Sequence, residues 1–556
     1  MKRVTYFFLF LTFLYVGGIQ AQLLTRTAEI KEKSGVEVGG FGNVIAGVDF
    51  DKDGKPEIYA VNTNMVDRAD ELIPRMYKFE LDSKTQKWEE VWQTTTSLTG
   101  QNTWPAMVWG DTDKDGKPEI YWGPINFAPS GGTYPDAPRV LVYEYPGDGT
   151  DNMGIADGLG GFIPNSTFNF AAGTGINIRP VRFVLGDPDL DGKQELIFCD
   201  RAPSATNLTA MHIGILSVDN IPDLGGGKEK WTVEYSGTGA AEFGTSSKYD
   251  VAILNNVIYL FDSAGKVYSI KYTAGAWKLI KTQTSMNAIG SFKGTKVVDI
   301  DKDGKNEILL ADWFNNAKGA GAKAWLLQQD ADTLKATALV DFEPLGAVRL
   351  NGADAGDIDG DGKLDFICGS RSEANNSKMT PIFRMEYQGG DIKNAASYTA
   401  SVIDSAYWTK KGNMDVIVVA NVDGDKEDEV LYTQGYSYQN PNDDRMPLIV
   451  LDSKYTPVSV EKITSNIPTE FYLEQNYPNP FNPTTQIRFG ITEASNVELK
   501  VYDILGREIV TLIDKEFMNA GVYNVKFNAV DLASGIYIYK LTTGNHSISK
   551  KMQLMK

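Results

Sequence analysis

Six short segments of the chain place carboxylates at alternate positions around a tight turn. Five follow the pattern D-x-D-x-D-G-K-x-[DE], the sixth is a variant of it, and each runs directly into an apolar stretch such as IYAV. Alternate side chains on such a loop can turn their oxygens toward one centre, and glycine at the sixth position permits a left-handed backbone turn. The chemistry that this arrangement suits is the binding of a hard cation by oxygen ligands.

Calcium is the cation that we expect these loops to hold. Carboxylate oxygens in this number suit Ca²⁺ at roughly 2.3–2.6 Å, and the loops contain no His or Cys that would favour zinc or copper. We expect five to six structural Ca²⁺ ions, because carboxylates this close would otherwise repel one another. The expected ligands are, in loop 1 (residues 49–57), Asp49, Asp51, Asp53 and Glu57; in loop 2 (111–119), Asp111, Asp113, Asp115 and Glu119; in loop 3 (187–195), Asp187, Asp189, Asp191 and Glu195; in loop 4 (299–307), Asp299, Asp301, Asp303 and Glu307; in loop 5 (357–365), Asp357, Asp359, Asp361 and Asp365; and in loop 6 (421–429), Asn421, Asp423, Asp425 and Glu429.

Loop 6 departs from the pattern at two positions. Asn421 replaces the first aspartate, and Lys426 stands where the other loops have glycine. A left-handed conformation costs a lysine free energy that glycine does not lose. The sequence therefore predicts that loop 6 is the weakest of the six sites.

The spacing of the loops predicts a ring of repeated units. The loops begin at residues 49, 111, 187, 299, 357 and 421, so the intervals are 62, 76, 112, 58 and 64 residues. The interval of 112 is twice 56, and residues 242–262 within it keep the apolar strand but lack the aspartates. Seven units of four short strands predict an all-β, seven-bladed β-propeller. Residues 23–33 alternate well enough to close the ring as an extra strand, although the last unit could supply its own.

The two ends of the chain read differently from the repeats. Lys2 and Arg3 precede an apolar run and Ala21, which predicts a signal peptide over residues 1–21. A proline-rich stretch near residue 480 is followed by short alternating runs, which predict a small β-sandwich. We therefore expect a propeller over 22–465 and a separate C-terminal domain over 466–556. No later segment has the roughly 18 apolar residues of a membrane helix.

Both parts resemble known families. The loops resemble the FG-GAP or VCBS repeats, which implies a propeller with calcium between the first two strands of a blade. The segments NYPNPFNP (476–483), VYDILG (501–506) and LASGIYIY (532–539) resemble a type A C-terminal sorting domain of the type IX secretion system. This resemblance implies a Gram-negative bacterium, an interaction with the type IX machinery, and a secreted or outer-membrane cell-surface location.

The composition argues against several functions. A formal charge of −18 would repel nucleic acid. The chain has only two histidines, His212 and His546, and none of the familiar catalytic motifs, so we expect no enzyme and a structural role for His212. Cys199 and Cys368 each follow a loop within an apolar strand, and we expect both to be buried free thiols.

We expect the ligand-binding surface on the rim opposite the loops. Side chains after the second strand of each unit would suit a carbohydrate or protein ligand. The function that we expect is a secreted or cell-surface binding or adhesion protein; the alternatives are a calcium-dependent polysaccharide-active enzyme, such as a lyase, and a structural matrix component. The rim residues are Asn62, Asn64, Arg68, Asn126, Phe127, Arg201, Trp313, Phe314, Asn315, Arg371, Asn375, Tyr436 and Tyr438.

Overall fold

The computed structural model divides the chain into two compact units, residues 1–452 and 453–556, which we describe separately. The signal peptide predicted over residues 1–21 lies outside the described residues. The structure describes residues 24–37, 40–63, 73–82, 85–96, 104–124, 137–170, 178–200, 211–225, 227, 229–283, 290–313, 322–371, 379–407, 416–433, 447–453, 458–464, 468–529, 532–544 and 546–555.

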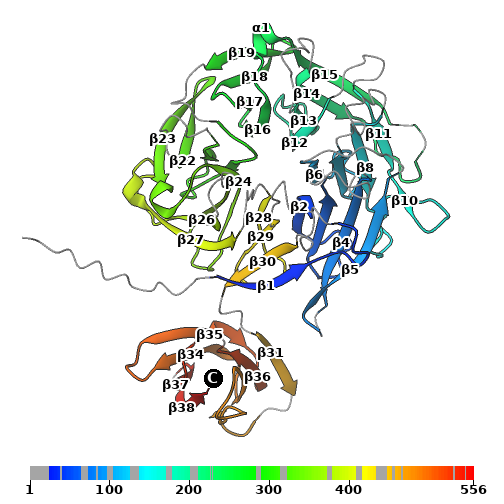
Figure 1. The fold of residues 1–556 in the computed structure, drawn as a ribbon. Helices are drawn as coiled ribbons and strands as arrows, with labels where there is room; N and C mark the ends of the chain where they lie inside the picture. The colour runs from blue at the N-terminus through cyan, green and yellow to red at the C-terminus, as the bar shows by residue number, and fades with distance from the viewer. Residues whose placement is uncertain are drawn as a thin grey trace, which may run out of the picture. The chain divides into compact units, whose positions relative to one another are not determined.

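Unit 1 is a β-propeller. Its described residues form seven four-stranded sheets that stand around a ring (Figure 1), in agreement with the seven units expected from the spacing. The sheets are β2 (Phe41–Val48), β3 (Glu57–Asn62), β4 (Arg75–Asp82) and β5 (Lys87–Thr95); β6 (Ala106–Gly110), β7 (Glu119–Gly123), β8 (Val140–Glu144) and β11 (Ser166–Phe168); β12 (Pro180–Gly186), β13 (Glu195–Asp200), β14 (Met211–Val218) and β15 (Trp231–Thr238); β16 (Lys248–Leu254), β17 (Val257–Asp262), β18 (Val267–Thr273) and β19 (Ala276–Gln283); β20 (Thr295–Val298), β21 (Glu307–Ala311), β22 (Lys323–Asp330) and β23 (Thr333–Asp341); β24 (Leu350–Gly356), β25 (Asp365–Ser370), β26 (Met379–Tyr387) and β27 (Tyr398–Tyr407); and β28 (Ile417–Ala420), β29 (Glu429–Thr433), β30 (Leu448–Ser453) and β1 (Leu24–Ile30).

The apolar run after each loop is explained by the position of its strand within the sheet. The second strand lies between two others and packs on both faces, so every residue of β3 is buried. The fourth strand β5 lies at an edge of its sheet, and its first residues alternate between exposed and half-buried. Ile45 and Tyr59 of one sheet share a core with Ile120 and Trp122 of the next. The core of unit 1 therefore lies between the faces of neighbouring sheets.

The unit expected to lack a loop is confirmed. Strands β16 and β17 pair up to Leu254 and Val257, so only two residues connect them where the other sheets have an acidic loop. The first of these two, Asn255, takes φ of 54°, as tight two-residue hairpins require.

The ring is closed by the N-terminal strand. Strand β1 lies beside β30 as the outermost member of the last sheet (Figure 1). Leu24 is fully buried and packs in one core with Ile449 and Leu451 of β30. The prediction that residues 23–33 supply the closing strand is therefore confirmed over Leu24–Ile30.

Unit 2 consists of two four-stranded sheets, as expected for a small β-sandwich. Its first strand, β31, pairs with β36, so the boundary lies after Asp452 and the predicted division at residue 465 is wrong. The segment 458–464 is the next described strand after β30, and its pairing assigns it to unit 2. The sheets are β31 (Val458–Thr464), β36 (Gly521–Asn528), β33 (Thr484–Ile491) and β32 (Tyr472–Leu473), and β35 (Glu508–Met518), β34 (Ser495–Asp503), β37 (Gly535–Thr543) and β38 (His546–Leu554).

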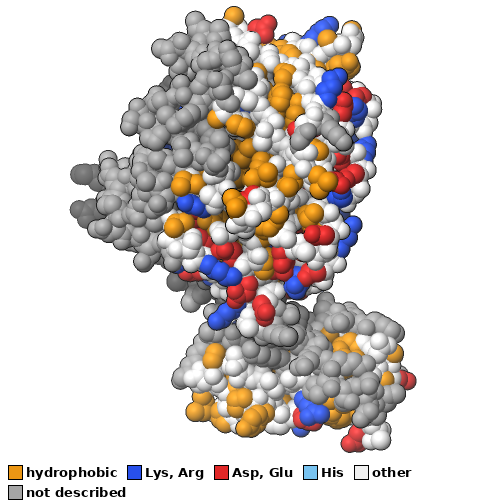
Figure 2. Space-filling view, turned by 90° about the vertical axis from the view of Figure 1, so that its right-hand side faces the viewer, with side chains coloured by type: hydrophobic (Ala, Val, Ile, Leu, Met, Phe, Trp, Pro, Cys, Tyr) orange, Lys and Arg blue, Asp and Glu red, His pale blue; other side chains and the backbone are white. Residues whose placement is uncertain are grey.

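Charged side chains are mixed rather than separated on the face of the molecule that Figure 2 shows. Figure 2 shows acidic and basic side chains interleaved along one edge of the propeller, with apolar side chains scattered across the face beside it. The net charge of −18 therefore does not form a single uniform field on this face. No helix among the described residues is long and apolar enough to cross a membrane.

Candidate calcium sites

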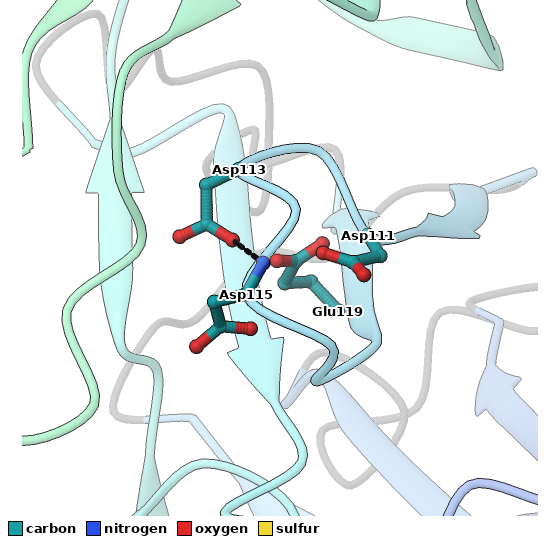
Figure 3. Close-up of side chains that lie close together, drawn as sticks. All are labelled: Asp111, Asp113, Asp115 and Glu119. Atoms are coloured by element: carbon teal, nitrogen blue, oxygen red, sulfur yellow. Dashed lines mark hydrogen bonds between the residues drawn. The ribbon is translucent and has the colours of Figure 1, made fainter.

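Loop 2 brings all four of its expected ligands together. Carboxylate oxygens of Asp111, Asp113, Asp115 and Glu119 lie within 4.8 Å of one another, and Figure 3 shows these side chains around a common centre. The loop backbone fixes them, because the Gly116 N–H donates to Asp111 Oδ2 at 3.1 Å and the backbone N–H at position two donates to Glu119 Oε2 at 3.1 Å. The four residues that the sequence predicts as ligands in loop 2 thus form one cluster in the structure.

Two oxygens of loop 2 have no hydrogen-bond partner. Glu119 is 0% exposed, and its Oε1 is buried without a donor, as is Asp111 Oδ1. Burial, together with the charges of Asp113 and Glu144, raises the pKa of Glu119 to about 9. A buried carboxylate oxygen without a partner is costly, and a divalent cation at the common centre would satisfy it. The residues of loop 2 therefore fit calcium.

Loop 3 shows the same features. Asp187, Asp189 and Glu195 offer oxygens within 4.8 Å of one another, and both carboxylate oxygens of Glu195 are buried without a hydrogen-bond partner. Burial, followed by the charge of Asp189, raises the pKa of Glu195 to about 9. Asp191 directs its backbone N–H to Asp187 Oδ1 at 3.1 Å, so it shapes the turn as well as carrying an expected ligand.

Loop 4 repeats the backbone frame. Asp299 accepts from the backbone N–H groups of Asp303 at 3.0 Å and Gly304 at 2.8 Å. Glu307 Oε2 is buried without a hydrogen-bond partner, and burial raises the pKa of this carboxyl. The fourth expected ligand, Asp301, lies at position three of the same turn.

Loops 1 and 5 differ from loops 2, 3 and 4 by a basic side chain among their carboxylates. In loop 1 the Lys78 ammonium lies 2.8 Å from Asp51 Oδ2 and 2.7 Å from Glu57 Oε1. In loop 5 the Arg384 guanidinium lies 2.6 Å from Asp359 Oδ2 and 2.5 Å from Asp365 Oδ1. Neither residue could be predicted from the loop motif, because each comes from the third strand of its sheet, outside the motif.

The remaining expected ligands of these two loops keep the common frame. Asp49 accepts from the Asp53 N–H at 3.1 Å, and Asp357 accepts from the Gly362 N–H at 2.8 Å. Asp361 accepts from the N–H of the following lysine at 2.9 Å. Loops 1 and 5 thus have the same kind of backbone hydrogen bonds as loops 2, 3 and 4 and differ in the basic side chain that contacts their carboxylates.

Loop 6 reaches a similar cluster by a different turn. Asn421 donates from Nδ2 to the Asp425 carbonyl at 2.6 Å and accepts from the Gly424 N–H at 2.7 Å, so both ends of its amide serve the loop backbone. Glu429 Oε1 and Asp425 Oδ2 are buried without hydrogen-bond partners. Burial, followed by the charge of Asp423, raises the pKa of Glu429 to about 9. The carboxylates fit a cation here too, and the geometry favours a turn role for Asn421.

The left-handed residues of the loops lie only partly at the positions that the sequence predicts. Glycine at position six has φ between 84° and 90° in loops 1 to 5, as predicted. Lys426 of loop 6 is not among the described residues with positive φ, so the strain predicted there is wrong. Position four is left-handed in all six loops, and it is occupied by Lys52, Lys114, Leu190, Lys302, Gly360 and Gly424.

Neighbouring loops lie side by side on one face of unit 1. Lys114 of loop 2 donates to the Gly192 carbonyl of loop 3, and Lys302 of loop 4 donates to the Gly362 carbonyl of loop 5 at 2.8 Å. Between loops 2 and 3 lies an open hollow of about 590 Å³, which Trp109 helps to line. Two of the three left-handed lysines at position four, Lys114 and Lys302, therefore join one loop to the next.

Most of the expected rim residues lie outside the described part of the chain. Of those described, Asn62 is fully buried and its amide bonds Glu37 and the Ile73 carbonyl, so it is structural. Trp313 is 9% exposed, and the guanidinium of Arg371 lies 5.4 Å from its ring. The residues outside the described part are Asn64, Arg68, Asn126, Phe127, Arg201, Phe314, Asn315, Asn375, Tyr436 and Tyr438.

The remaining candidate groups are buried. His212 is 1% exposed and stacks on Phe243, with 5.5 Å between ring centroids. Burial lowers the pKa of His212 to about 4, so it is neutral near pH 7. Cys199 and Cys368 are free and buried, as predicted. Among the described residues, none of these three groups is placed to meet a substrate.

Comparison with known proteins supports both resemblances. The family described as FG-GAP-like repeat matches residues 49–122 and 299–368, and the family described as secretion system C-terminal sorting domain matches residues 475–555. A search of curated proteins finds no match.

The solved structures that resemble the chain share little sequence with it. The N-terminal domain of Nup159 is 8% identical, with a TM-score of 0.37, over 77% of this chain and 95% of that one. A Nup159 chain in a complex of S. cerevisiae Dbp5 with Nup159, Gle1, IP6 and ADP is 8% identical, with a TM-score of 0.38, over 77% and 94%. The matching family models are more specific than these likenesses. The chain therefore carries FG-GAP-like repeats and ends in a sorting domain of the type IX secretion system, which marks it as a secreted or cell-surface protein.

Proposed function

We propose that this chain is a calcium-stabilised propeller that works outside the cell as a non-catalytic binding or adhesion protein. The observation that carries the calcium assignment is the set of buried carboxylate oxygens without partners, Glu119 Oε1 foremost, inside loops whose carboxylates converge. In the apo protein these groups repel one another, and Ca²⁺ would turn that repulsion into attraction. Calcium is abundant outside cells, where the sorting domain directs the chain.

The binding role rests on the form of the propeller and on what its described surface offers. The loops hold one face together, which leaves the rim opposite them for a ligand. There the guanidinium groups of Arg349 and Arg371 lie 5.1 Å and 5.4 Å from the ring of Trp313, which is 9% exposed. An aromatic ring held by two cationic groups suits an acidic carbohydrate or an acidic protein segment.

One experiment separates this role from its alternatives. The purified chain is loaded with calcium and incubated with a panel of acidic and neutral polysaccharides, and both binding and the length of the bound sugar are measured. We expect saturable binding with the sugar left intact. Shortened or unsaturated products would instead indicate a lyase-like enzyme, and self-association without any bound sugar or protein would indicate a matrix component.

A further inference from the structure

The six loops can be compared at one position that lies outside the loop motif. The residue two positions after the last carboxylate of each loop lies in the second strand of its sheet. It pairs with a residue of the third strand, and this third-strand residue is the position compared. That paired residue points to the same side of the sheet as the last carboxylate, because strand side chains alternate. In loop order the paired residues are Lys78, Val142, Ile215, Leu326, Arg384 and Val450.

Lys78 is enclosed by two carboxylates of loop 1 and two from outside it. Its Nζ lies 2.8 Å from Asp51, 2.7 Å from Glu57, 2.9 Å from Glu80 and 2.8 Å from Asp151. Lys78 is only 1% exposed, so these carboxylates replace its water shell. With four carboxylates within 2.9 Å, the ammonium of Lys78 fills the space that a cation of this cluster would occupy.

Arg384 occupies the same position in loop 5. Its guanidinium contacts Asp359 at 2.6 Å, Asp365 at 2.5 Å and Glu386 at 3.1 Å, and the residue is 7% exposed. Asp359 and Asp365 are positions three and nine of loop 5, and Glu386 pairs with Asp365 across the sheet. In loop 1 the corresponding contacts of Lys78 are Asp51, Glu57 and Glu80. Asp357 Oδ1, at position one of loop 5, has no hydrogen-bond partner. Two different basic side chains thus make the same contacts in two loops.

The other four loops have an aliphatic side chain at this position. Val142, Ile215 and Leu326 are fully buried, and Val450 is 2% exposed. In these loops the last carboxylate keeps at least one buried oxygen without a hydrogen-bond partner. Glu57 Oε1 of loop 1 also has no hydrogen-bond partner, but the Lys78 ammonium lies 2.7 Å from it as an ion pair. Loop 2 is the closest match to loop 1, because Glu144 pairs with Glu119 as Glu80 pairs with Glu57. The cation on the third strand is what separates the two sets of loops.

We propose that Lys78 and Arg384 are built-in cations that take the place of calcium in loops 1 and 5, so that calcium binds in loops 2, 3, 4 and 6. This inference rests on the proposed calcium function and refines it. A divalent ion at the centre of loop 1 would have to displace an ammonium that already contacts positions three and nine. The two loops with built-in cations would therefore keep their fold when calcium is removed.

The test counts bound calcium in the full chain and in matched variants. Calcium per chain is measured by elemental analysis after dialysis against a fixed submillimolar free concentration. We expect four ions in the unchanged protein, one more in each of Lys78→Val and Arg384→Leu, and one fewer in Val142→Lys. The control is Lys55→Met, which removes a half-buried lysine at position seven of loop 1 that pairs with Asp53 and Glu80 but with neither position three nor position nine, and it is expected to leave the count unchanged.

Each outcome of the count decides between the two proposals. Six ions in the unchanged protein, or an unaltered count in Val142→Lys, would overturn this inference and leave the calcium function standing. No bound calcium in any variant would instead overturn the proposed function. If Lys78→Val folds only in calcium, its melting temperature is measured at increasing calcium concentrations. We expect it to rise more steeply than the melting temperature of the unchanged protein. If it does not fold at all, the counts for Arg384→Leu and Val142→Lys decide.

Discussion

At the scale of single residues, Glu119 is the carboxylate whose charge has opposite effects with and without calcium. Without the ion its Oε1 is buried without a hydrogen-bond partner and burial disfavours its charge, whereas with the ion the charged form is expected to be a ligand. We therefore expect Glu119→Gln to melt no lower than the unchanged protein in EDTA, and to be less stable in calcium by about 1–3 kcal/mol. Differential scanning fluorimetry in both buffers measures the two effects.

The matched control for Glu119→Gln is the same change at Glu89, which is exposed on β5 and remote from the loop motif. Glu89→Gln should follow the unchanged protein in both buffers. A Glu119→Gln protein that loses equal stability with and without calcium would contradict the assignment, because that result would mean that Glu119 acts through packing alone.

His212 makes a prediction about pH. Burial lowers its pKa to about 4 in the folded chain, against an ordinary value of about 6.5 in the unfolded chain. As pH falls below 6.5 the unfolded chain gains a proton that the folded chain does not, so folding loses up to about 3 kcal/mol by pH 4. His212→Leu should remove this part of the acid sensitivity.

Denaturant unfolding of both proteins between pH 7 and pH 4 measures the effect of His212. The control is His546→Leu, because His546 is exposed on β38 of unit 2. We expect the slope of stability against pH to become shallower in the His212 variant alone. Parallel slopes in all three proteins would show that His212 does not titrate differently in the folded and unfolded chains.

At the scale of elements, strand β1 is expected to hold the ring closed. Leu24 is fully buried against β30, and Arg26 of the same strand pairs with Asp404 of β27 at 2.8 Å. Leu24→Ala should cost about 2–5 kcal/mol in the free energy of unfolding, because it leaves a cavity at the closure. The same change at Leu345, which is 38% exposed, should cost far less. Equal costs in urea unfolding would mean that β1 is not a structural part of the ring.

The sequence predicted the local features of each element better than the pairings between elements. The loops and their glycines could be read because cation ligation requires a fixed local spacing, and the hairpin at Asn255 could be read as a unit without aspartates. Lys78 was missed because its role depends on a pairing with Tyr59 of another strand. A signal did exist, since KFE and RME stand where other third strands read VYE, ILS, LLQ and VLD.

The boundary between the two units shows a second limit of the sequence. Residues 458–464 form a strand of ordinary composition, so its propensity cannot tell which sheet it joins. Only its pairing with β36 places it in unit 2. Long-range pairing likewise decided that β1 rather than a strand of the last repeat closes the propeller.

At the scale of the whole molecule, the acidic composition and the propeller have one common explanation. The loops gather carboxylates on one face of unit 1, and we expect the fold to be fully stable only where a cation neutralises them. In loops 1 and 5 that cation is expected to belong to the chain, and in the other loops it is expected to be calcium from outside the cell. The chain would thus reach its full stability only after export.

The most direct test is the thermal unfolding of the full chain in millimolar calcium and in excess EDTA. We predict that EDTA lowers the melting temperature of unit 1 by roughly 10 °C or more, because several bound ions stabilise the folded state together. Added calcium should restore it, whereas unit 2, whose sequence has no such loop, should melt unchanged. Identical melting curves in calcium and EDTA would contradict the claim that calcium stabilises this propeller.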